Sequence, residues 1–119
     1  MREKREVVVY CLTLGYVYED YPFHDDKWCV MRHKASKKTF AYIYEKNDQI
    51  WVNVKCEPQW RDFWRSTFEA VVPGYHMNKE HWNSIILDGT IPKRDIKRMI
   101  AESYDLTKGK KDAENSRMD

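Results

Sequence analysis

TFAYIYEKNDQIWVNVK, residues 39–55, is the stretch that decides the fold of this chain. Its two ends are rich in the aromatic and β-branched residues that strands favour, and Lys46-Asn47-Asp48 forms a polar turn between them. Side chains alternate between the two faces of a strand, so the second half divides into Ile50, Val52 and Val54 against Trp51, Asn53 and Lys55. We predict an antiparallel hairpin with one face in the core and the other at least partly exposed to solvent.

The flanking sequence extends this hairpin into an α+β pattern. Trp28 to His33 predicts a preceding strand, which the polar turn Lys34 to Lys38 joins to the hairpin, giving an antiparallel meander. Apolar spacing and proline at helix starts predict a helix over 5–14, a short edge strand within 16–23, a helix from Pro58, a strand over 83–87 and a helix from Pro92. The predicted fold class is α+β: a two-layer structure with an antiparallel β-sheet and helices packed on one face.

The helix after Pro58 carries an aromatic stripe. Its members are Trp60, Phe63, Trp64 and Phe68, spaced i, i+3, i+4 and i+8. We expect this stripe to pack across the sheet as core rather than to hold a cofactor.

Composition indicates one domain. The chain has 119 residues, of which 42% are hydrophobic and 14% aromatic, enough for one packed core. We assign the domain to residues 1–107 and expect 108–119, which are charged and small polar residues, to form a disordered tail. The N-terminal residues lack the apolar region of a secretory signal, and no long apolar run is present, so we expect a cytoplasmic protein without membrane association.

Cysteine and charge patterns narrow the chemistry. Cys11, Cys29 and Cys56 are widely spaced and form no CxxC pair, so we expect reduced thiols in or near the core. Net charge is only +2, but the segment from Lys27 to Lys38 contains five basic residues and no acid. Such a cluster could contact phosphate.

PGYHMNKEHW, residues 73–82, combines turn formers, histidines, an amide, a lysine and aromatics. We expect Tyr75 and Trp82 to anchor this segment in the core, and Asn78 to adopt a left-handed backbone or to bond its own chain. His76, Asn78 and Lys79 would then be free to contact phosphate, base edges or a small acidic ligand. The i, i+5 spacing of His76 and His81 does not match a metal site, and no catalytic or phosphate-loop motif is present.

These features together resemble the MmcQ/YjbR family of small bacterial proteins. Besides residues 73–82, the resemblance rests on Tyr18-Glu19-Asp20-Tyr21-Pro22-Phe23, Lys38-Thr39-Phe40-Ala41, Val54-Lys55-Cys56 and Ser103-Tyr104-Asp105-Leu106. It implies a two-layer α+β fold likened to CyaY and to type III secretion chaperones. It also implies a double-wing motif, from which the family is labelled predicted DNA-binding, with residues 39–55 and 76–79 as candidate wings.

The family pattern maps onto Lys55, Tyr75, His76, Asn78, Lys79, His81 and Trp82. This chain departs from it at two turns. The family often has Pro-Gly where this chain has Gly15-Tyr16, and a glycine where it has His24.

We therefore expect a non-enzymatic binding protein with no catalytic residue, metal or cofactor. DNA is the first expected partner, contacted through Arg32, Lys34, Lys37, Lys38, Lys55 and Lys79. One alternative is a protein or peptide interaction module that uses Trp51 with Tyr42 or Tyr44 on the open face of the sheet. Another is a small-ligand pocket or enzyme in which His76 or His81 acts as an acid or base.

Overall fold

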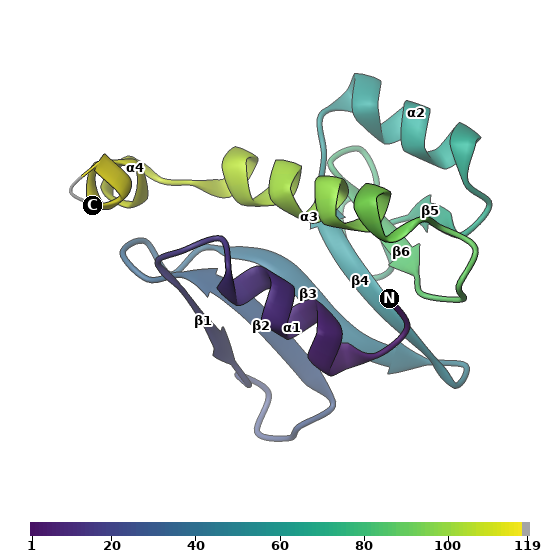
Figure 1. The fold of residues 1–119 in the computed structure, drawn as a ribbon, viewed down its shortest axis with the longest axis horizontal. Helices are drawn as coiled ribbons and strands as arrows, with labels where there is room; N and C mark the ends of the chain where they lie inside the picture. Colours follow the sequence, from purple (N-terminus) through teal and green to yellow (C-terminus); the bar gives the residue numbers. More distant parts are fainter. Residues whose placement is uncertain (118–119) are drawn as a thin grey trace.

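The computed structural model describes residues 1–117 and is built on one six-stranded antiparallel sheet (Figure 1). In the sheet the strands follow the order β1-β2-β3-β4-β6-β5. Their bounds are β1 Val17–Asp20, β2 Trp28–His33, β3 Thr39–Lys46, β4 Gln49–Lys55, β5 Val71–Pro73 and β6 Trp82–Ile86. The sequence predicted the β2-β3-β4 meander, whereas the three-residue strand β5 was not predicted.

The central hairpin has the register that its sequence pattern requires. Tyr44 pairs with Trp51 and Lys46 with Gln49, so Asn47 and Asp48 form a two-residue turn. Both turn residues have positive φ, 53° and 62°, as the favoured hairpin turn demands. Asparagine and aspartate tolerate that backbone better than other residues with a side chain.

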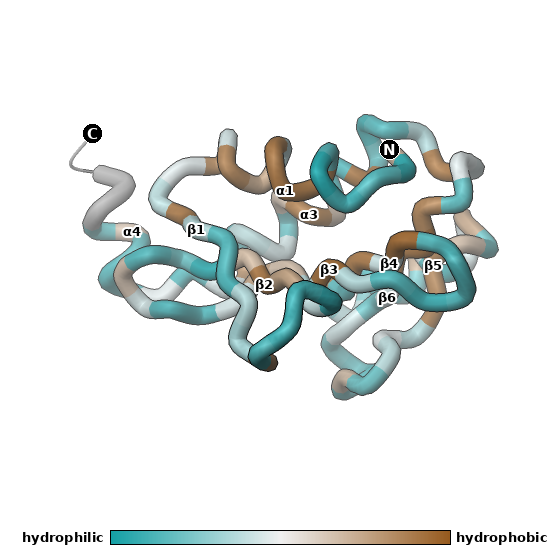
Figure 2. The backbone as a smooth tube through the Cα atoms, turned by 90° about the horizontal axis from the view of Figure 1, so that it is seen from below, coloured by the Kyte–Doolittle hydropathy of each residue, from teal (hydrophilic) through white to brown (hydrophobic). Residues whose placement is uncertain are grey.

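Three helices cover one face of this sheet, as Figure 2 shows for α1 and α3. They are α1 Lys4–Leu12, α2 Pro58–Thr67 and α3 Lys93–Thr107. The core lies between the two layers, so the predicted two-layer α+β fold is confirmed. Two tyrosine hydroxyls tie the helices in place: Tyr10 donates to the carbonyl of Lys97 at 3.1 Å, and Tyr104 to that of Gly15 at 3.0 Å.

The aromatic stripe of α2 is only partly in the core, which corrects the sequence expectation. Trp64 is buried and stacks on Phe68, but Phe63 is 47% exposed and Trp60 36% exposed. The reason is position: α3 packs on the central strands β3 and β4 and α1 on β1 and β3, whereas the main sheet contacts of α2 are with β5 and β6 at the other end. Half of the stripe therefore faces outward.

The C-terminal region contains a helix that was not predicted from the sequence. Residues Lys110–Arg117 form helix α4, and residues 118–119 lie outside the described part of the chain. Asp112 accounts for this order, because its carboxylate accepts hydrogen bonds from the backbone N–H of Gly109 at 2.8 Å and of Ser36 at 3.1 Å. One aspartate in the first turn thus reaches back to the residue that precedes the helix, as in a capping box, and ties the helix to the β2–β3 turn.

Candidate functional site

The segment 74–81, which connects β5 to β6, folds over the face of the sheet that the helices leave open. It is held there by a network of buried hydrogen bonds centred on Asn53, which is fully buried. The Asn53 amide oxygen accepts from the hydroxyls of Tyr44 at 2.7 Å and Ser84 at 2.5 Å. Its amide nitrogen donates to the carbonyl of Tyr75 at 2.9 Å, and the N–H of Tyr75 donates to the Ser84 hydroxyl at 2.8 Å. We call these four residues the Asn53 network.

This arrangement corrects two expectations from the sequence. The second face of β4 is not left to solvent at Asn53, because the 74–81 segment covers it. Tyr75 and Trp82 do anchor that segment, but on the open face and half-buried, not in the main core. Tyr75 packs against Tyr44 and Trp51, with ring centroids 5.9 and 6.0 Å apart, and Trp82 packs edge-on against Tyr42 at 5.6 Å.

Arg65 of α2 clamps the other end of the segment. Its guanidinium donates to the carbonyls of Lys79 at 2.5 Å and Trp82 at 3.2 Å, and to the side-chain oxygen of Asn83 at 2.6 Å. Asn78 bonds its own chain, since its side-chain oxygen accepts from the N–H of Glu80 at 2.9 Å. Of the two roles expected for Asn78, the structure has the second, and the left-handed backbone lies instead at His76 with φ 59°.

An aromatic cleft of about 430 Å³ lies on this open face. Its floor is formed by Trp28 of β2 and Tyr42 of β3. One wall comes from the β1–β2 connection, residues 21–27, with Phe23 and Asp25, and the other from His76 and Met77 of the 74–81 segment. Figure 2 shows loops between strands extending below the sheet, on the side opposite α1 and α3.

The rings of the cleft are held by one another. Trp28 stacks on Tyr44 with centroids 4.0 Å apart and an interplanar angle of 14°, and Phe23 meets Trp28 edge-on at 6.3 Å. Because the Tyr44 hydroxyl belongs to the Asn53 network, the floor of the cleft and the 74–81 wall are fixed by the same buried amide.

Both walls contain a histidine with a left-handed backbone. His24 has φ 61° and His76 has φ 59°. His24 stands where the resembled family often has glycine, the residue that adopts this conformation without steric cost. Tyr16, the other departure from the family pattern, has φ 56°. At both positions this chain therefore has a left-handed backbone at a residue with a side chain.

A basic groove of about 410 Å³ adjoins the aromatic cleft, because Tyr42 lines both. Its cationic side chains come from three elements, and no carboxylate is among its lining residues. Those cations are Arg32, Lys37, Lys38 and Lys55. Arg32 is partly neutralised by an ion pair with Asp20 at 2.9 Å, and it also donates to the carbonyl of Lys37 and to the Thr39 hydroxyl at 3.0 Å.

The structure thus brings together about half of the site residues that the sequence predicted. Arg32, Lys37, Lys38, Lys55 and Trp82 line the basic groove, and His76 lines the aromatic cleft beside Tyr75. Lys34, Asn78, Lys79 and His81 are exposed and line neither. The cleft residues Phe23, Trp28 and Met77 were missed, although aromatics at alternate strand positions were a signal for Trp28.

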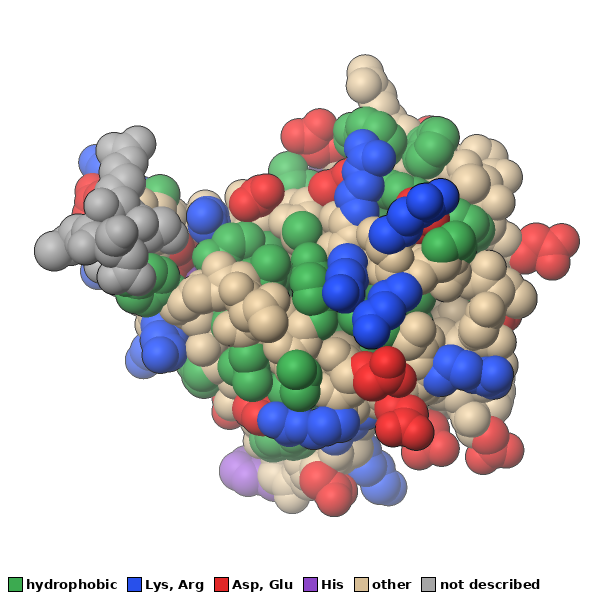
Figure 3. Space-filling model, in the orientation of Figure 1, with side chains coloured by type: hydrophobic (Ala, Val, Ile, Leu, Met, Phe, Trp, Pro, Cys, Tyr) green, Lys and Arg blue, Asp and Glu red, His purple; other side chains and the backbone are tan. Residues whose placement is uncertain are grey.

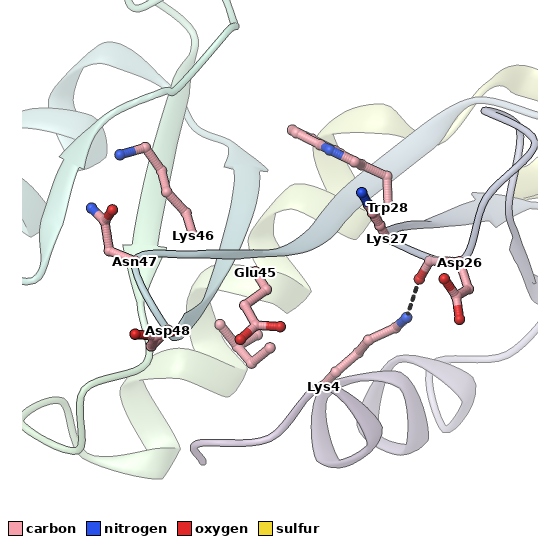
Figure 4. A pocket seen from close by; sticks show the side chains of 9 residues that line it. Lys4, Asp26, Lys27, Trp28, Glu45, Lys46, Asn47 and Asp48 are labelled. Atoms are coloured by element: carbon pink, nitrogen blue, oxygen red, sulfur yellow. Dashed lines mark hydrogen bonds between the residues drawn. The ribbon is translucent and has the colours of Figure 1, made fainter.

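A second cavity, of about 500 Å³, lies at the end of the sheet between α1 and the tip of the β3–β4 hairpin (Figure 4). Its lining mixes lysines with carboxylates, and the Lys4 ammonium donates to the backbone carbonyl of Asp26 at 2.9 Å. Because charges of both signs alternate around it, this cavity favours neither an anion nor a cation.

The helix-covered face has no single-sign surface either. Figure 3 shows Lys and Arg side chains interspersed with Asp and Glu and with apolar side chains over this face. Concentrated positive charge therefore distinguishes the basic groove from the helix face.

Residues 1–117 give little support to thiol chemistry, metal binding or a membrane-spanning helix. The three cysteines are free and buried, and burial raises the pKa of the thiols of Cys11 to about 12 and of Cys56 to about 11. These thiols lack the depressed pKa that a nucleophile requires. Within the same residues no group of three or more His, Cys, Asp or Glu side chains could hold a metal ion. None of the helices found there is long and apolar enough to cross a membrane.

Known proteins share this sequence pattern and this architecture. The family model described as YjbR matches residues 12–106, which span all six strands and most of α3. The chain belongs to the YjbR family. Among YjbR relatives, it is 36% identical over 109 residues to the uncharacterized protein YyaQ of Bacillus subtilis, covering 83% of this chain and 88% of YyaQ. It is 28% identical over 99 residues to the uncharacterized protein YjbR of Escherichia coli K12, covering 83% and 81%.

Solved structures agree with the YjbR assignment. The crystal structure of the Deinococcus radiodurans protein DR2400, with a DUF419 domain, superposes with a TM-score of 0.82 at 27% identity, covering 92% of this chain and 81% of that one. A Pseudomonas syringae protein superposes with a TM-score of 0.78 at 23% identity, covering 89% and 99%, which supports the fold alone. The resemblance inferred from residues 73–82 is therefore confirmed at the level of family and fold.

Proposed function

We propose that this YjbR protein is a non-enzymatic nucleic-acid-binding protein whose basic groove contacts phosphates, with DNA as the partner. The observation that carries the proposal is the groove itself, which gathers Lys37, Lys38 and Lys55 beside Arg32 with no carboxylate in its lining. Phosphate contacts by lysine supply most of the affinity of non-specific nucleic-acid binding.

The groove makes a quantitative prediction. Lys37, Lys38 and Lys55 form no ion pair within residues 1–117 and would release about three counterions. The logarithm of the binding constant should therefore fall with the logarithm of salt concentration with a slope of about −2.1 for a single strand and about −2.7 for a duplex. Raising salt from about 50 to about 200 mM should then weaken binding roughly 18-fold for a single strand and roughly 40-fold for a duplex. This modest slope suits a chain whose net charge is only +2.

Fluorescence anisotropy with labelled oligonucleotides tests the proposal. The variant Lys38→Gln/Lys55→Gln should reduce the slope by about 0.7 to 0.9 for each lysine removed. The matched control Lys93→Gln/Arg94→Gln removes the same charge from exposed positions in the first turn of α3, outside the groove. No binding at low salt, or equal loss in both variants, would remove the basis of the proposal.

A protein partner is a second candidate, favoured by the outward half of the α2 stripe. Trp60 and Phe63 expose aromatic surface on the helix side, and the Arg98 guanidinium lies 4.6 Å from the Trp60 ring centroid. Exposed aromatics of this kind are enriched at interfaces. The two candidates separate experimentally, because loss of Phe63 should leave binding to nucleic acid unchanged.

A further inference from the structure

We infer that the aromatic cleft receives unpaired bases of a single-stranded nucleic acid whose phosphates lie in the basic groove. The inference rests on the proposed function and names the form of nucleic acid that the site would select. Its starting observation is that the two depressions are continuous: Tyr42 lines both, and Trp82 in the groove packs against Tyr42 at 5.6 Å.

The cleft has the chemistry of a stacking site. Four of its six lining side chains are aromatic rings or thioether, namely Phe23, Trp28, Tyr42 and Met77, and its volume of about 430 Å³ lies in the range of ligand pockets. Aromatic rings bind bases of any sequence because every base has a π-face. Asp25 and His76 supply the polar atoms at its walls.

Prior ordering of the rings supports this role. Trp28 is stacked on Tyr44, Tyr44 donates to Asn53, and Asn53 donates to Tyr75 beside the His76 wall. The floor therefore loses little conformational freedom when a base binds. By contrast, Phe23 is 55% exposed at the outer wall, where it is available to a ligand.

Charge placement selects the single strand over the duplex. The lysines beside the rings can contact the phosphates of a single strand while its bases turn into the cleft. Proteins that bind single strands combine a basic groove and aromatic stacking in this way. In a duplex the bases are already stacked on their neighbours, so only the groove would contact it. Only the single strand then gains stacking energy in the cleft, and the duplex does not.

The test compares an oligodeoxythymidine of about 16 nucleotides with the matching duplex in the same buffer. We expect the single strand to bind at least about tenfold more tightly, and Phe23→Ala to weaken single-strand binding by about fivefold or more, as loss of one stacking contact does. Phe23→Tyr, which keeps an aromatic ring at this position, should bind the single strand about as tightly as the natural chain. The matched control is Phe63→Ala on α2, which removes the same ring at a similar exposure, 47%, and should change neither affinity.

The outcomes separate this inference from the proposed function. If duplex and single strand bind equally and Phe23→Ala has no effect, the cleft inference is wrong while the groove proposal stands. If neither form binds at low salt, both are wrong. If thymidine monophosphate competes as strongly as the oligonucleotide, the occupant is a free nucleotide, and the single-strand inference is overturned.

Discussion

Replacing Asn53 with alanine removes the buried amide that joins the sheet to the 74–81 segment. Three hydrogen bonds are lost, from Tyr44, from Ser84 and to Tyr75. Each contributes about 1 kcal/mol net, and leaving a buried partner without one costs about 1 to 3 kcal/mol. We therefore expect the free energy of unfolding to fall by at least about 3 kcal/mol, a large part of the about 5 to 15 kcal/mol typical of a domain.

Urea denaturation followed by tryptophan fluorescence measures this loss, provided that the slope with denaturant is unchanged. Asn78→Ala is the matched control, because Asn78 is exposed and its side-chain oxygen accepts a single hydrogen bond among the described residues, from the backbone N–H of Glu80. We expect that substitution to cost no more than about 1 kcal/mol.

A double-mutant cycle isolates the network. Tyr44→Phe should cost about 1 kcal/mol in the natural chain and much less when Asn53 is already alanine, since its partner is then gone. Equal costs in the two backgrounds, or an Asn53→Ala variant that loses less than about 1 kcal/mol, would refute the reasoning.

Three further predictions concern the backbone and the core. Gly74→Ala should cost about 1 to 3 kcal/mol in the same assay, because a Cβ at this buried glycine would lie 2.8 Å from that of Trp82; unchanged stability would contradict this close approach. His24→Gly should raise stability by about 0.5 to 1 kcal/mol by relieving the left-handed backbone, whereas the exposed control His81→Gly should not. Burial holds the pKa of His33 in the folded protein below its ordinary 6.5. As pH falls, the unfolded chain therefore binds a proton at this histidine before the folded protein does, which favours unfolding. Stability should therefore drop between about pH 7 and 5.5, and His33→Gln should show a smaller drop in urea titrations at the two pH values.

The sequence was a good guide to elements whose pattern is local. Alternation and turn chemistry predicted the β2-β3-β4 meander, and proline predicted the starts of α2 and α3. β5 was missed because three residues are too few to carry a period. Helix α4 was not predicted, because the contact that ties it to the fold joins residues distant in sequence: the Asp112 carboxylate accepts from the backbone N–H of Ser36.

The candidate site was less accessible to sequence reasoning. The cluster from Lys27 to Lys38 pointed to the basic groove, but the approach of Lys55 and Tyr42 to it depends on pairing between strands. Phe63 illustrates the opposite error: its helical spacing indicated core, and its exposure follows from where α2 sits on the sheet.

By itself the sequence determined the fold class, the family and the chemical content of residues 73–82, because these depend on residue types at fixed spacing along the chain. Only the tertiary structure decided that this segment closes over Asn53, and that His76 lines one cleft together with Phe23 and Trp28. The physical reason is that a buried amide is satisfied by groups distant in sequence, since Asn53 takes its partners from Tyr44, Tyr75 and Ser84. No local pattern encodes that set of partners.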